Sequence, residues 1–232
     1  MKLGIFSDIH GNQYAFNEFL KIIEPLNLDK LVFLGDLYGY YYGQNDIIAS
    51  LCKLKNLDVW LRGNHETIFL NLLESKIDEN ECVQRYGHCY NNVYEKTSNS
   101  IIRKIKSLPN SAELTVQNKK ILFCHGTPQD CENGRLYPKD VSDKWEYGDY
   151  DVVIYGHTHF RLERHFGDKL LLNPGSLGQP RDQNKPCFVI LTLPELTVEF
   201  IDMKFDRKLL ENEIMKNDPN NLKLIELLYR YE

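Results

Sequence analysis

The sequence predicts an α/β layered fold with its helices on the outside. Short β-type runs alternate with segments of helical spacing, and this order recurs several times along the 232 residues. Hydrophobic residues make up 42% of the chain and charged residues 26%, a balance typical of globular proteins that disfavours a disordered chain. No apolar run approaches the roughly 18 to 20 residues that span a bilayer. We expect one domain over residues 1–232 and no membrane segment.

The first part of the chain predicts three strands and the helices between them. The strands are expected at 2–7, 30–34 and 57–61, where short runs of apolar residues occur. Helical spacing follows the first strand, and a second helix is expected over 44–55. Residues 66–107 are helical and more polar, with no β-type run. We therefore predict a helical excursion of two or three helices beside the sheet.

After Pro109 the pattern changes to consecutive strands. These are expected at 112–117, 120–124, 151–155, 161–166, 169–172, 186–193 and 196–203. Asn118-Lys119 and Gly167-Asp168 predict hairpin turns. The C-terminal segment, 206–231, predicts two short helices separated by the helix breaker NDPNN. No internal repeat or linker indicates a second domain.

Side chains that bind metals follow five of the predicted strands. The segments DIH, GD, GNH, HG and GHTH supply Asp8, His10, Asp36, Asn64, His65, His125, His157 and His159. Each segment follows a strand, so all can converge on one rim of a sheet, where open α/β sheets bind ligands. Taken singly, an Asp there is usually a helix cap and an Asn a turn residue. Together, imidazoles and carboxylates from five strand ends predict two or more divalent ions suited to phosphate ester hydrolysis.

These blocks also resemble a known family. DIH, GD, RGNHE, CHG and GHTH, in that order, are similar to the five signature blocks of the calcineurin-like metallophosphoesterase superfamily. NPGSLGQPRD, at 173–182, resembles the segment after GHTH in the small prokaryotic phosphodiesterases of that superfamily. The resemblance covers residues 3 to about 200. It implies a four-layer αββα sandwich of two mixed β-sheets flanked by helices, with a two-metal centre between loops.

The resemblance further implies roles for single residues. Seven would hold two divalent metal ions, with Asp8, His10 and His159 on the first, Asn64, His125 and His157 on the second, and Asp36 bridging both. A hydroxide bridging the ions would be the nucleophile, and the catalytic histidine, His65, would stabilise the transition state or protonate the leaving oxygen. We expect manganese, with iron, zinc or nickel as alternatives, because nitrogen and oxygen ligands accept several such ions.

Two departures from the family pattern bear on this interpretation. The third block usually reads GNHD, and in the family that acid orients the histidine. Here Glu66 occupies the position, so we expect it to orient His65 through a longer arm. The second block, GDLYGYYYG, lacks the aspartate-arginine-glycine sequence of the protein phosphatases.

The expected function is therefore a phosphodiesterase on small or nucleotide-type substrates. One alternative is a phosphomonoesterase, either a protein phosphatase or a dinucleoside-polyphosphate hydrolase. A second alternative is a non-catalytic binding scaffold on the same fold.

Two residues are expected to bind substrate. Tyr38 opens a tyrosine-rich loop two residues after Asp36, so a ring of this loop should stack on a nucleobase or aryl leaving group. The alternative is a surface loop tucked against the helices. Arg181, in the NPGSLGQPRD turn, is expected to clamp a phosphate. Its alternative is a surface salt bridge to Asp182 or Glu163.

Charge and the N-terminal segment predict partners and location. The chain has 28 basic and 33 acidic residues, a net charge of −5, so no broad basic surface for stable nucleic-acid binding is expected. The start of the chain reaches Ser7 and Asp8 without room for a signal-peptide apolar region, which predicts a cytoplasmic protein. The expected partner is a phosphoester small molecule or nucleotide, and a homo-oligomer remains open.

Overall fold

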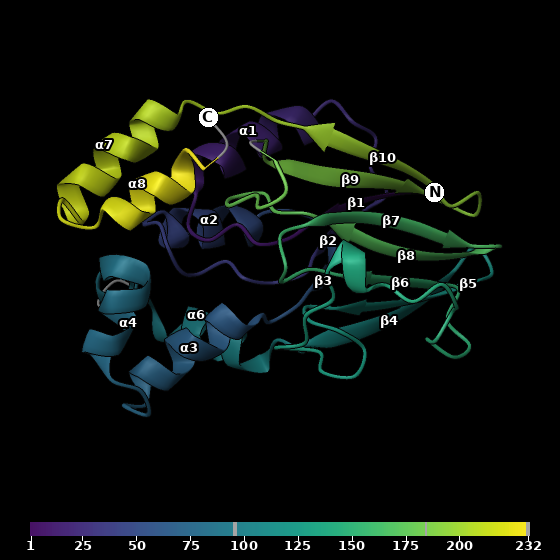
Figure 1. The fold of residues 1–232 in the computed structure, drawn as a ribbon, viewed down its shortest axis with the longest axis horizontal. Helices are drawn as coiled ribbons and strands as arrows, with labels where there is room; N and C mark the ends of the chain where they lie inside the picture. The colour runs from purple at the N-terminus through teal and green to yellow at the C-terminus, as the bar shows by residue number, and fades with distance from the viewer. Residues whose placement is uncertain (95–96, 184, 231–232) are drawn as a thin grey trace.

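The computed structural model describes residues 1–94, 97–183 and 185–230, and its centre is a pair of five-stranded mixed sheets (Figure 1). The first sheet has the order β10-β9-β1-β2-β3, with bounds β1 Lys2–Phe6, β2 Lys30–Phe33, β3 Leu57–Trp60, β9 Cys187–Thr192 and β10 Thr197–Asp202. The second has the order β4-β5-β6-β8-β7, with bounds β4 Ser111–Val116, β5 Lys119–Cys124, β6 Val152–Tyr155, β7 Arg161–Phe166 and β8 Lys169–Pro174. Within them β1, β2 and β3 run parallel to one another, as do β5, β6 and β8.

The inner faces of the two sheets form a shared aliphatic core. Leu3 and Ile5 of β1 pack in one cluster with Ile121 of β5 and Ile154 of β6, and all four are fully buried. Alternate residues of β1 point the other way, where the Phe6 ring lies 4.5 Å from that of Phe19. Because a strand buried on both faces needs residues without polar side chains, the buried part of β1 after Lys2 consists of Leu, Gly, Ile and Phe.

Helices cover the outer face of the first sheet. They are α1 Gln13–Ile23, α2 Gln44–Leu51, α3 Asn64–Leu73 and α6 Asn99–Ser107, whose apolar faces share one cluster with that sheet. The Asn12 side chain begins α1 by accepting a hydrogen bond from the Ala15 amide at 3.0 Å. The outer face of the second sheet is covered by the segment between β5 and β6, which includes the 3₁₀ turn Pro138–Asp140 and packs Trp145 and Tyr150 onto the strands.

The remaining helices lie together at one end of the molecule (Figure 1). They are α4 Glu79–Tyr86 with the 3₁₀ turn Gly87–Cys89, α5 Asn91–Tyr94, α7 Arg207–Asn217 and α8 Leu222–Leu228. The C-terminal helix pair is thus helical as expected in the residues described. The excursion is helical too, but its described residues form four α-helices, α3 to α6, rather than the two or three expected. The excursion begins at Asn64. Residues 95–96 of the predicted excursion and residue 231 of the predicted C-terminal helices lie outside the described residues.

The structure confirms the predicted α/β sandwich of two mixed sheets flanked by helices. The hairpin turn predicted at Asn118-Lys119 lies one residue earlier in the structure. The β4–β5 hairpin turns at Gln117 and Asn118, with φ of 51° and 59°, and Lys119 already belongs to β5. A two-residue hairpin turn of this type requires positive φ at both central positions, which Gln117 adopts here. The turn at Gly167-Asp168 is confirmed between β7 and β8.

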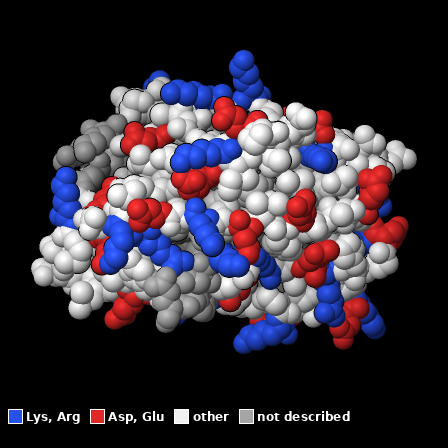
Figure 2. All heavy atoms as spheres, turned by 90° about the horizontal axis from the view of Figure 1, so that it is seen from above, with Lys and Arg blue, Asp and Glu red and all other residues white. Residues whose placement is uncertain are grey.

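Among the described residues, no helix has the length and apolar character needed to cross a membrane. Figure 2 shows basic and acidic side chains intermixed over one face of the molecule. On that face the described residues form no continuous basic area, in keeping with the net charge of −5.

Candidate metal centre

Loops that leave both sheets meet at one seam and carry the predicted metal ligands. Asp8, Asp36 and Asn64 follow β1, β2 and β3 of the first sheet. His125 follows β5 and His157 follows β6 of the second sheet. Because the strands within each of these groups are parallel, their carboxyl ends lie side by side and deliver these side chains to one place.

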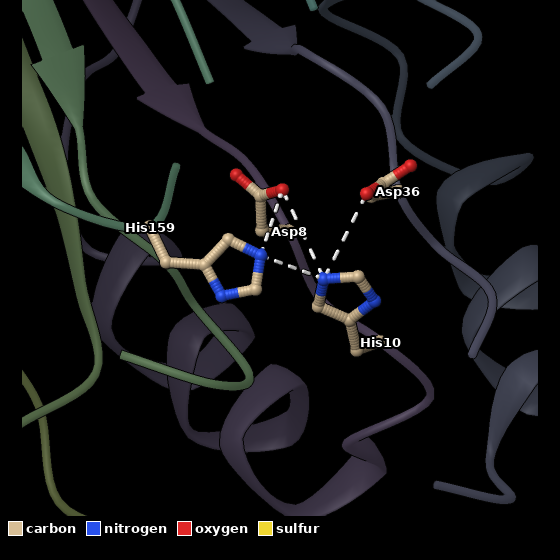
Figure 3. Close-up of side chains that lie close together, drawn as sticks. All are labelled: Asp8, His10, Asp36 and His159. Atoms are coloured by element: carbon tan, nitrogen blue, oxygen red, sulfur yellow. Dashed lines mark hydrogen bonds and ion pairs between the residues drawn. The ribbon is translucent and has the colours of Figure 1, made fainter. Parts of the chain in front are cut away.

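The first group of candidate ligands contains Asp8, His10, Asp36 and His159 (Figure 3), with one ligand atom from each lying within 4.8 Å of all the others. His10 Nε2 lies 2.9 Å from His159 Nε2, 3.9 Å from Asp8 Oδ1 and 3.8 Å from Asp36 Oδ2. His159 Nε2 lies 3.3 Å from Asp8 Oδ1. All four side chains are buried.

The second group contains Asp36, His125 and His157 under the same distance limit, and all three are buried. His125 Nε2 lies 3.3 Å from Asp36 Oδ2 and 3.2 Å from Asn64 Oδ1. Asn64 therefore sits at this group, and Asp36 belongs to both groups. The structure thus brings together all seven residues predicted as metal ligands.

An unusual backbone conformation aims these side chains. Asp8, His10, Asp36, His157 and His159 all have positive φ, between 50° and 63°. Such left-handed conformations cost about 1–3 kcal/mol each in a non-glycine residue and concentrate at functional sites. Hydrogen bonds between the loops hold them, including those from the Asp8 amide to Gly35 O and from the His10 amide to Asp36 O, both 3.0 Å.

Main-chain carbonyls orient three of the imidazoles. The Nδ1 atoms of His10, His125 and His159 lie 2.8, 2.9 and 2.6 Å from the carbonyl oxygens of Tyr38, Leu34 and Gln179. A carbonyl can only accept, so each Nδ1 carries a proton, and Nε2 is the nitrogen that each ring turns to the cluster. This arrangement is the usual one for histidines that bind metals.

His157 is turned the other way. Its Nε2 accepts a hydrogen bond from Arg135 Nε at 3.1 Å, whereas its Nδ1 is buried without a hydrogen-bond partner. Asp8 Oδ1 is also buried without a hydrogen-bond partner. Buried polar atoms are normally satisfied, so the bare oxygen of Asp8 fits an atom that awaits a metal ion. While Nε2 of the neutral His157 accepts from Arg135, its Nδ1 carries the proton, and one of these nitrogens would have to be freed to bind a metal. A donor set of imidazole nitrogens with carboxylate and amide oxygens suits first-row divalent ions.

Burial and mutual charge leave most of the cluster in the state that binds metal. Burial would raise the pKa of Asp8, but His159 and His125 lower it to about 2. Burial also opposes ionisation of Asp36, yet His125 and His65 hold its pKa well below the ordinary value. Burial lowers the pKa of His157 to about 4. These groups are accordingly ionised carboxylates and a neutral imidazole near neutral pH.

His125 is the exception. Burial opposes its protonation, but Asp36 beside it outweighs burial and raises the pKa of His125 to about 9. The protein without metal therefore keeps a proton on this imidazole near neutral pH, and that proton must leave when a metal binds.

The predicted catalytic histidine, His65, lies beside the first group of candidate ligands but is not one of its four members. Its ring centroid is 4.7 Å from that of His10, and its amide donates to Asp36 Oδ1 at 2.8 Å. Its Nδ1 is 2.7 Å from the hydroxyl of Tyr90. Burial lowers the pKa of His65 to about 4.

The expected role of Glu66 is wrong. Its carboxylate accepts hydrogen bonds from the amides of Gly63, Asp36, Leu37 and Tyr38 at 2.6, 2.9, 2.6 and 3.3 Å, and does not bond the His65 ring. Glu66 is on the first turn of α3 and points back towards the β2 loop, so it reaches these amides rather than the imidazole. It therefore fixes the loop that carries Asp36.

The tyrosine-rich loop presents a different ring from the one expected. Tyr38 is fully buried, and its ring stacks on Phe69 at a centroid distance of 4.4 Å, which leaves it no face for a ligand. The partly exposed ring of Tyr40 lies 4.9 Å from His10 and 5.4 Å from His65. Tyr38 contributes its carbonyl to the centre, and Tyr40 contributes a ring.

Arg181 lies at the edge of the first group. Its Nη2 donates to Gln179 Oε1 at 3.1 Å and to the Tyr40 hydroxyl at 3.3 Å, and its amide donates to His159 O at 3.3 Å. In the described part of the chain it forms neither of the expected salt bridges. Asp182 accepts from the Arg161 amide, and Glu163 from His165.

Three residues at the site were not identified from the sequence: Tyr40 as the ring at the centre, Tyr90, and Arg135. Tyr90 lies in the helical excursion and Arg135 in the long segment after β5, both outside the five blocks. Neither position carries a local pattern that marks it, because both reach the site only through tertiary packing.

A sandwich of two sheets whose strand ends gather buried imidazoles and carboxylates defines the class of metallophosphoesterases. The family model for the calcineurin-like phosphoesterase superfamily domain matches residues 1–195, and the chain belongs to that superfamily.

Curated relatives and solved structures agree with this assignment. An uncharacterised protein of Methanocaldococcus jannaschii is 30% identical over 93% of this chain and 92% of its own length. A phosphodiesterase of the same organism is 26% identical over 75% of this chain and 83% of its own. A hypothetical protein of Pyrococcus horikoshii has a TM-score of 0.80 at 20% identity, covering 98% of this chain and 97% of that one, and so shares the fold.

Proposed function

We propose that this protein is a metal-dependent phosphodiesterase that hydrolyses small or nucleotide-type phosphodiesters. The observation that carries the proposal is the position of Asp36, whose carboxylate belongs to both groups of candidate ligands. The name of the phosphodiesterase relative from M. jannaschii supports the choice of diester over monoester. A phosphodiesterase of Escherichia coli, 22% identical over 85% of this chain and 91% of its own length, supports the same choice.

Two divalent ions would be held by the seven residues of the centre. Asp8, His10 and His159 would bind the first, Asn64, His125 and His157 the second, and Asp36 both. Manganese is our first choice, with iron, zinc and nickel as alternatives. Bound there, such ions would lower the pKa of water and neutralise the charge of the phosphate.

The residues around the centre have distinct tasks in this proposal. His65, held beside His10, protonates the leaving oxygen as the bond from that oxygen to phosphorus breaks. The negative charge of a bound phosphoester would favour the protonated imidazole and so oppose the burial that lowers the pKa of His65. Arg181 binds a non-bridging phosphate oxygen, since its guanidinium contacts neutral oxygens among the described residues and forms no salt bridge with them. Tyr40, partly exposed beside His65, contacts the leaving group.

The test is hydrolysis of an aryl phosphodiester beside its monoester. The protein is stripped with a chelator and resupplied separately with manganese, zinc or magnesium. We expect diester turnover to vanish on stripping and to return with manganese. Turnover of the monoester alone would establish a phosphomonoesterase instead. No turnover together with no bound metal would favour a binding scaffold.

Arg181→Ala tests the phosphate contact. Loss of a charged hydrogen bond to substrate should raise KM by roughly 10-fold or more, since such bonds contribute about 1.5–3 kcal/mol. Arg164→Ala is the control, because the guanidinium of Arg164, on β7, pairs with the exposed Asp143 at 2.6 Å. Equal kinetics for the two variants would remove Arg181 from the proposal.

A further inference from the structure

We propose that Tyr90 is the positioning residue of His65. Its hydroxyl fixes the imidazole so that Nε2 faces the metal centre, the task that the family pattern assigned to an acid at position 66. The proposal rests on the proposed function, in which His65 protonates the leaving oxygen.

The contact between the two side chains is short and enclosed. The Tyr90 hydroxyl lies 2.7 Å from His65 Nδ1, a full hydrogen-bond distance. Tyr90 is fully buried and His65 is 5% exposed. Their rings are nearly parallel, 9° apart with centroids separated by 6.3 Å. A buried hydrogen bond of this kind has little competition from water and therefore restrains the ring strongly.

No other polar side chain restrains this edge of the imidazole among the described residues. The Glu66 carboxylate is occupied by four main-chain amides. Asp36 Oδ1 accepts from the His65 amide and not from the ring. Tyr90 is thus the group that determines the rotation of the ring.

The backbone of the tyrosine-rich loop closes the same edge. Gly39 has φ of 90°, and a Cβ built there would lie 2.2 Å from His65 Nδ1. The absence of a side chain at Gly39 therefore lets the loop pack directly on the imidazole. With Nδ1 enclosed by Tyr90 and Gly39, Nε2 lies on the opposite edge, where none of the described residues hydrogen-bonds it.

A hydroxyl suits a histidine that gives up a proton. When His65 carries two protons, Nδ1–H donates to the Tyr90 oxygen, whose own proton can turn to the main-chain oxygen of His65 at 3.4 Å. Nε2 then passes its proton to the leaving oxygen, which keeps the electron pair of the broken bond to phosphorus. Nδ1 keeps its proton and its bond to Tyr90 throughout, so the ring does not rotate.

Kinetics with two leaving groups test the role of Tyr90 in the reaction. A poor leaving group such as an alkoxide needs the proton from His65, whereas a nitrophenolate needs it much less. Tyr90→Phe should lower kcat for an alkyl diester by roughly 10- to 100-fold, the usual effect of losing a residue that orients a functional histidine. The nitrophenyl diester should lose less than about threefold, and KM for both should stay within about twofold.

Tyr42→Phe is the matched control. This variant also removes a hydroxyl that is hydrogen-bonded within the protein, since the Tyr42 hydroxyl donates to Asp218 Oδ2 at 2.5 Å. The Tyr42 hydroxyl makes no hydrogen bond to His65. The alkyl-to-nitrophenyl ratio of kcat for this variant should equal that of the wild type. If Tyr90 had a merely structural role, Tyr90→Phe would lower kcat for both substrates by the same factor and leave its alkyl-to-nitrophenyl ratio at the wild-type value.

A second measurement does not depend on turnover. Nitrogen-15 NMR of the imidazoles, with zinc as a diamagnetic ion, reports the environment of Nδ1 in His65, assigned through its loss in His65→Asn. We expect Tyr90→Phe to shift this resonance and to leave the other histidines unchanged. An unchanged resonance overturns the proposal, as does a shifted one with an unchanged leaving-group ratio. If Tyr90→Phe shifts the resonance but the wild-type protein hydrolyses no phosphoester, the contact that positions His65 is supported and the proposed function is wrong.

Discussion

Asp36 shows how single residues determine the centre. Its carboxylate faces ligands from both sheets, lying 3.8 Å from His10 Nε2 and 3.3 Å from His125 Nε2. The same side chain accepts the His65 amide at 2.8 Å. One residue therefore links both groups of candidate ligands with the candidate catalytic histidine.

The proton on His125 leads to a pH-dependence prediction. Below pH about 9 the imidazolium form predominates in the metal-free protein, and a metal ion competes with that proton. Apparent metal affinity should rise about tenfold per pH unit from neutral pH up to that pKa and then level off. Calorimetric titration with metal should release close to one proton per protein, seen as an enthalpy that differs between buffers of different ionisation heat. Identical enthalpies in the two buffers would contradict it.

The left-handed backbone at Asp8 leads to a prediction about stability. Both Asp8→Ala and Asp8→Gly remove the ligand, but only glycine adopts φ of 56° without strain. In metal-free protein, Asp8→Gly should therefore be more stable than Asp8→Ala by about 1 kcal/mol. Urea denaturation of the two variants measures the difference. The same pair at Ser176, where no positive φ is found, should show no advantage for glycine.

The sequence predicted which side chains would lie together at the candidate metal centre, because residue type and strand context coincide there. Asp8, Asp36 and His125 each come within two residues of the end of an apolar run, so the sheet itself brings them together. The choice between Tyr38 and Tyr40 had no such support. Positive φ at Gly39 and Tyr40 turns the loop so that Tyr38 packs inward, and a pattern of adjacent tyrosines does not encode that turn.

At the scale of elements, Asp218 joins the C-terminal helices to the helical excursion. It is 5% exposed, accepts from His88 Nδ1 at 2.6 Å and from the His88 amide at 2.9 Å, and also bonds Tyr42. It lies between α7 and α8, so three separate segments meet on one carboxylate. This contact places the helices that flank the centre relative to one another.

Asp218→Ala should lower the free energy of unfolding by about 2–3 kcal/mol, because it removes the hydrogen bonds that a buried carboxylate accepts from His88 and Tyr42. Asp206→Ala is the control, since that exposed carboxylate only caps α7 and should cost about 1 kcal/mol. Chemical denaturation gives both values. Hydrogen exchange should also accelerate at residues 87–89 in Asp218→Ala alone. Equal losses of stability in the two variants would show that Asp218 does not join the helices.

Element type was predictable wherever periodicity was strong. The strands β1, β2 and β3 differ from their predicted ranges by one residue at most, because each is a short apolar run bounded by polar residues. The helix expected over 44–55 ends at Leu51, and the excursion divides at Gly87, whose φ is 72°. At Gly87 the backbone packs so closely on Asp218 that a side chain would not fit, and such a contact with a distant segment was not visible in local sequence.

At the scale of the whole molecule, the centre joins the two sheets. Asp8, Asp36 and Asn64 come from one sheet and His125 and His157 from the other. A metal ion held between them would bind the folded chain and not the unfolded one, and so would stabilise the fold.

Metal removal should therefore lower the melting temperature. With free metal about 100-fold above Kd, the stabilisation is about 2.7 kcal/mol. For a chain of this size that corresponds to a rise in Tm of roughly 5–10 °C. Calorimetry before and after chelation measures it, and Asp36→Asn, which weakens both sites, should show little shift. A wild-type Tm that is insensitive to metal would contradict the proposed sites.

The strand order of the first sheet has a consequence for biosynthesis. β1 lies between β2 and β9, so Ile5 pairs with both Val32 and Val189. Asp8 is translated early, whereas its neighbour His159 and the strand that completes the sheet emerge from the ribosome some 150 or more residues later. A nascent chain therefore holds no complete centre until nearly all of it has been made. A chain that ends before His157 would therefore lack candidate ligands of both groups and could not form the two proposed metal sites.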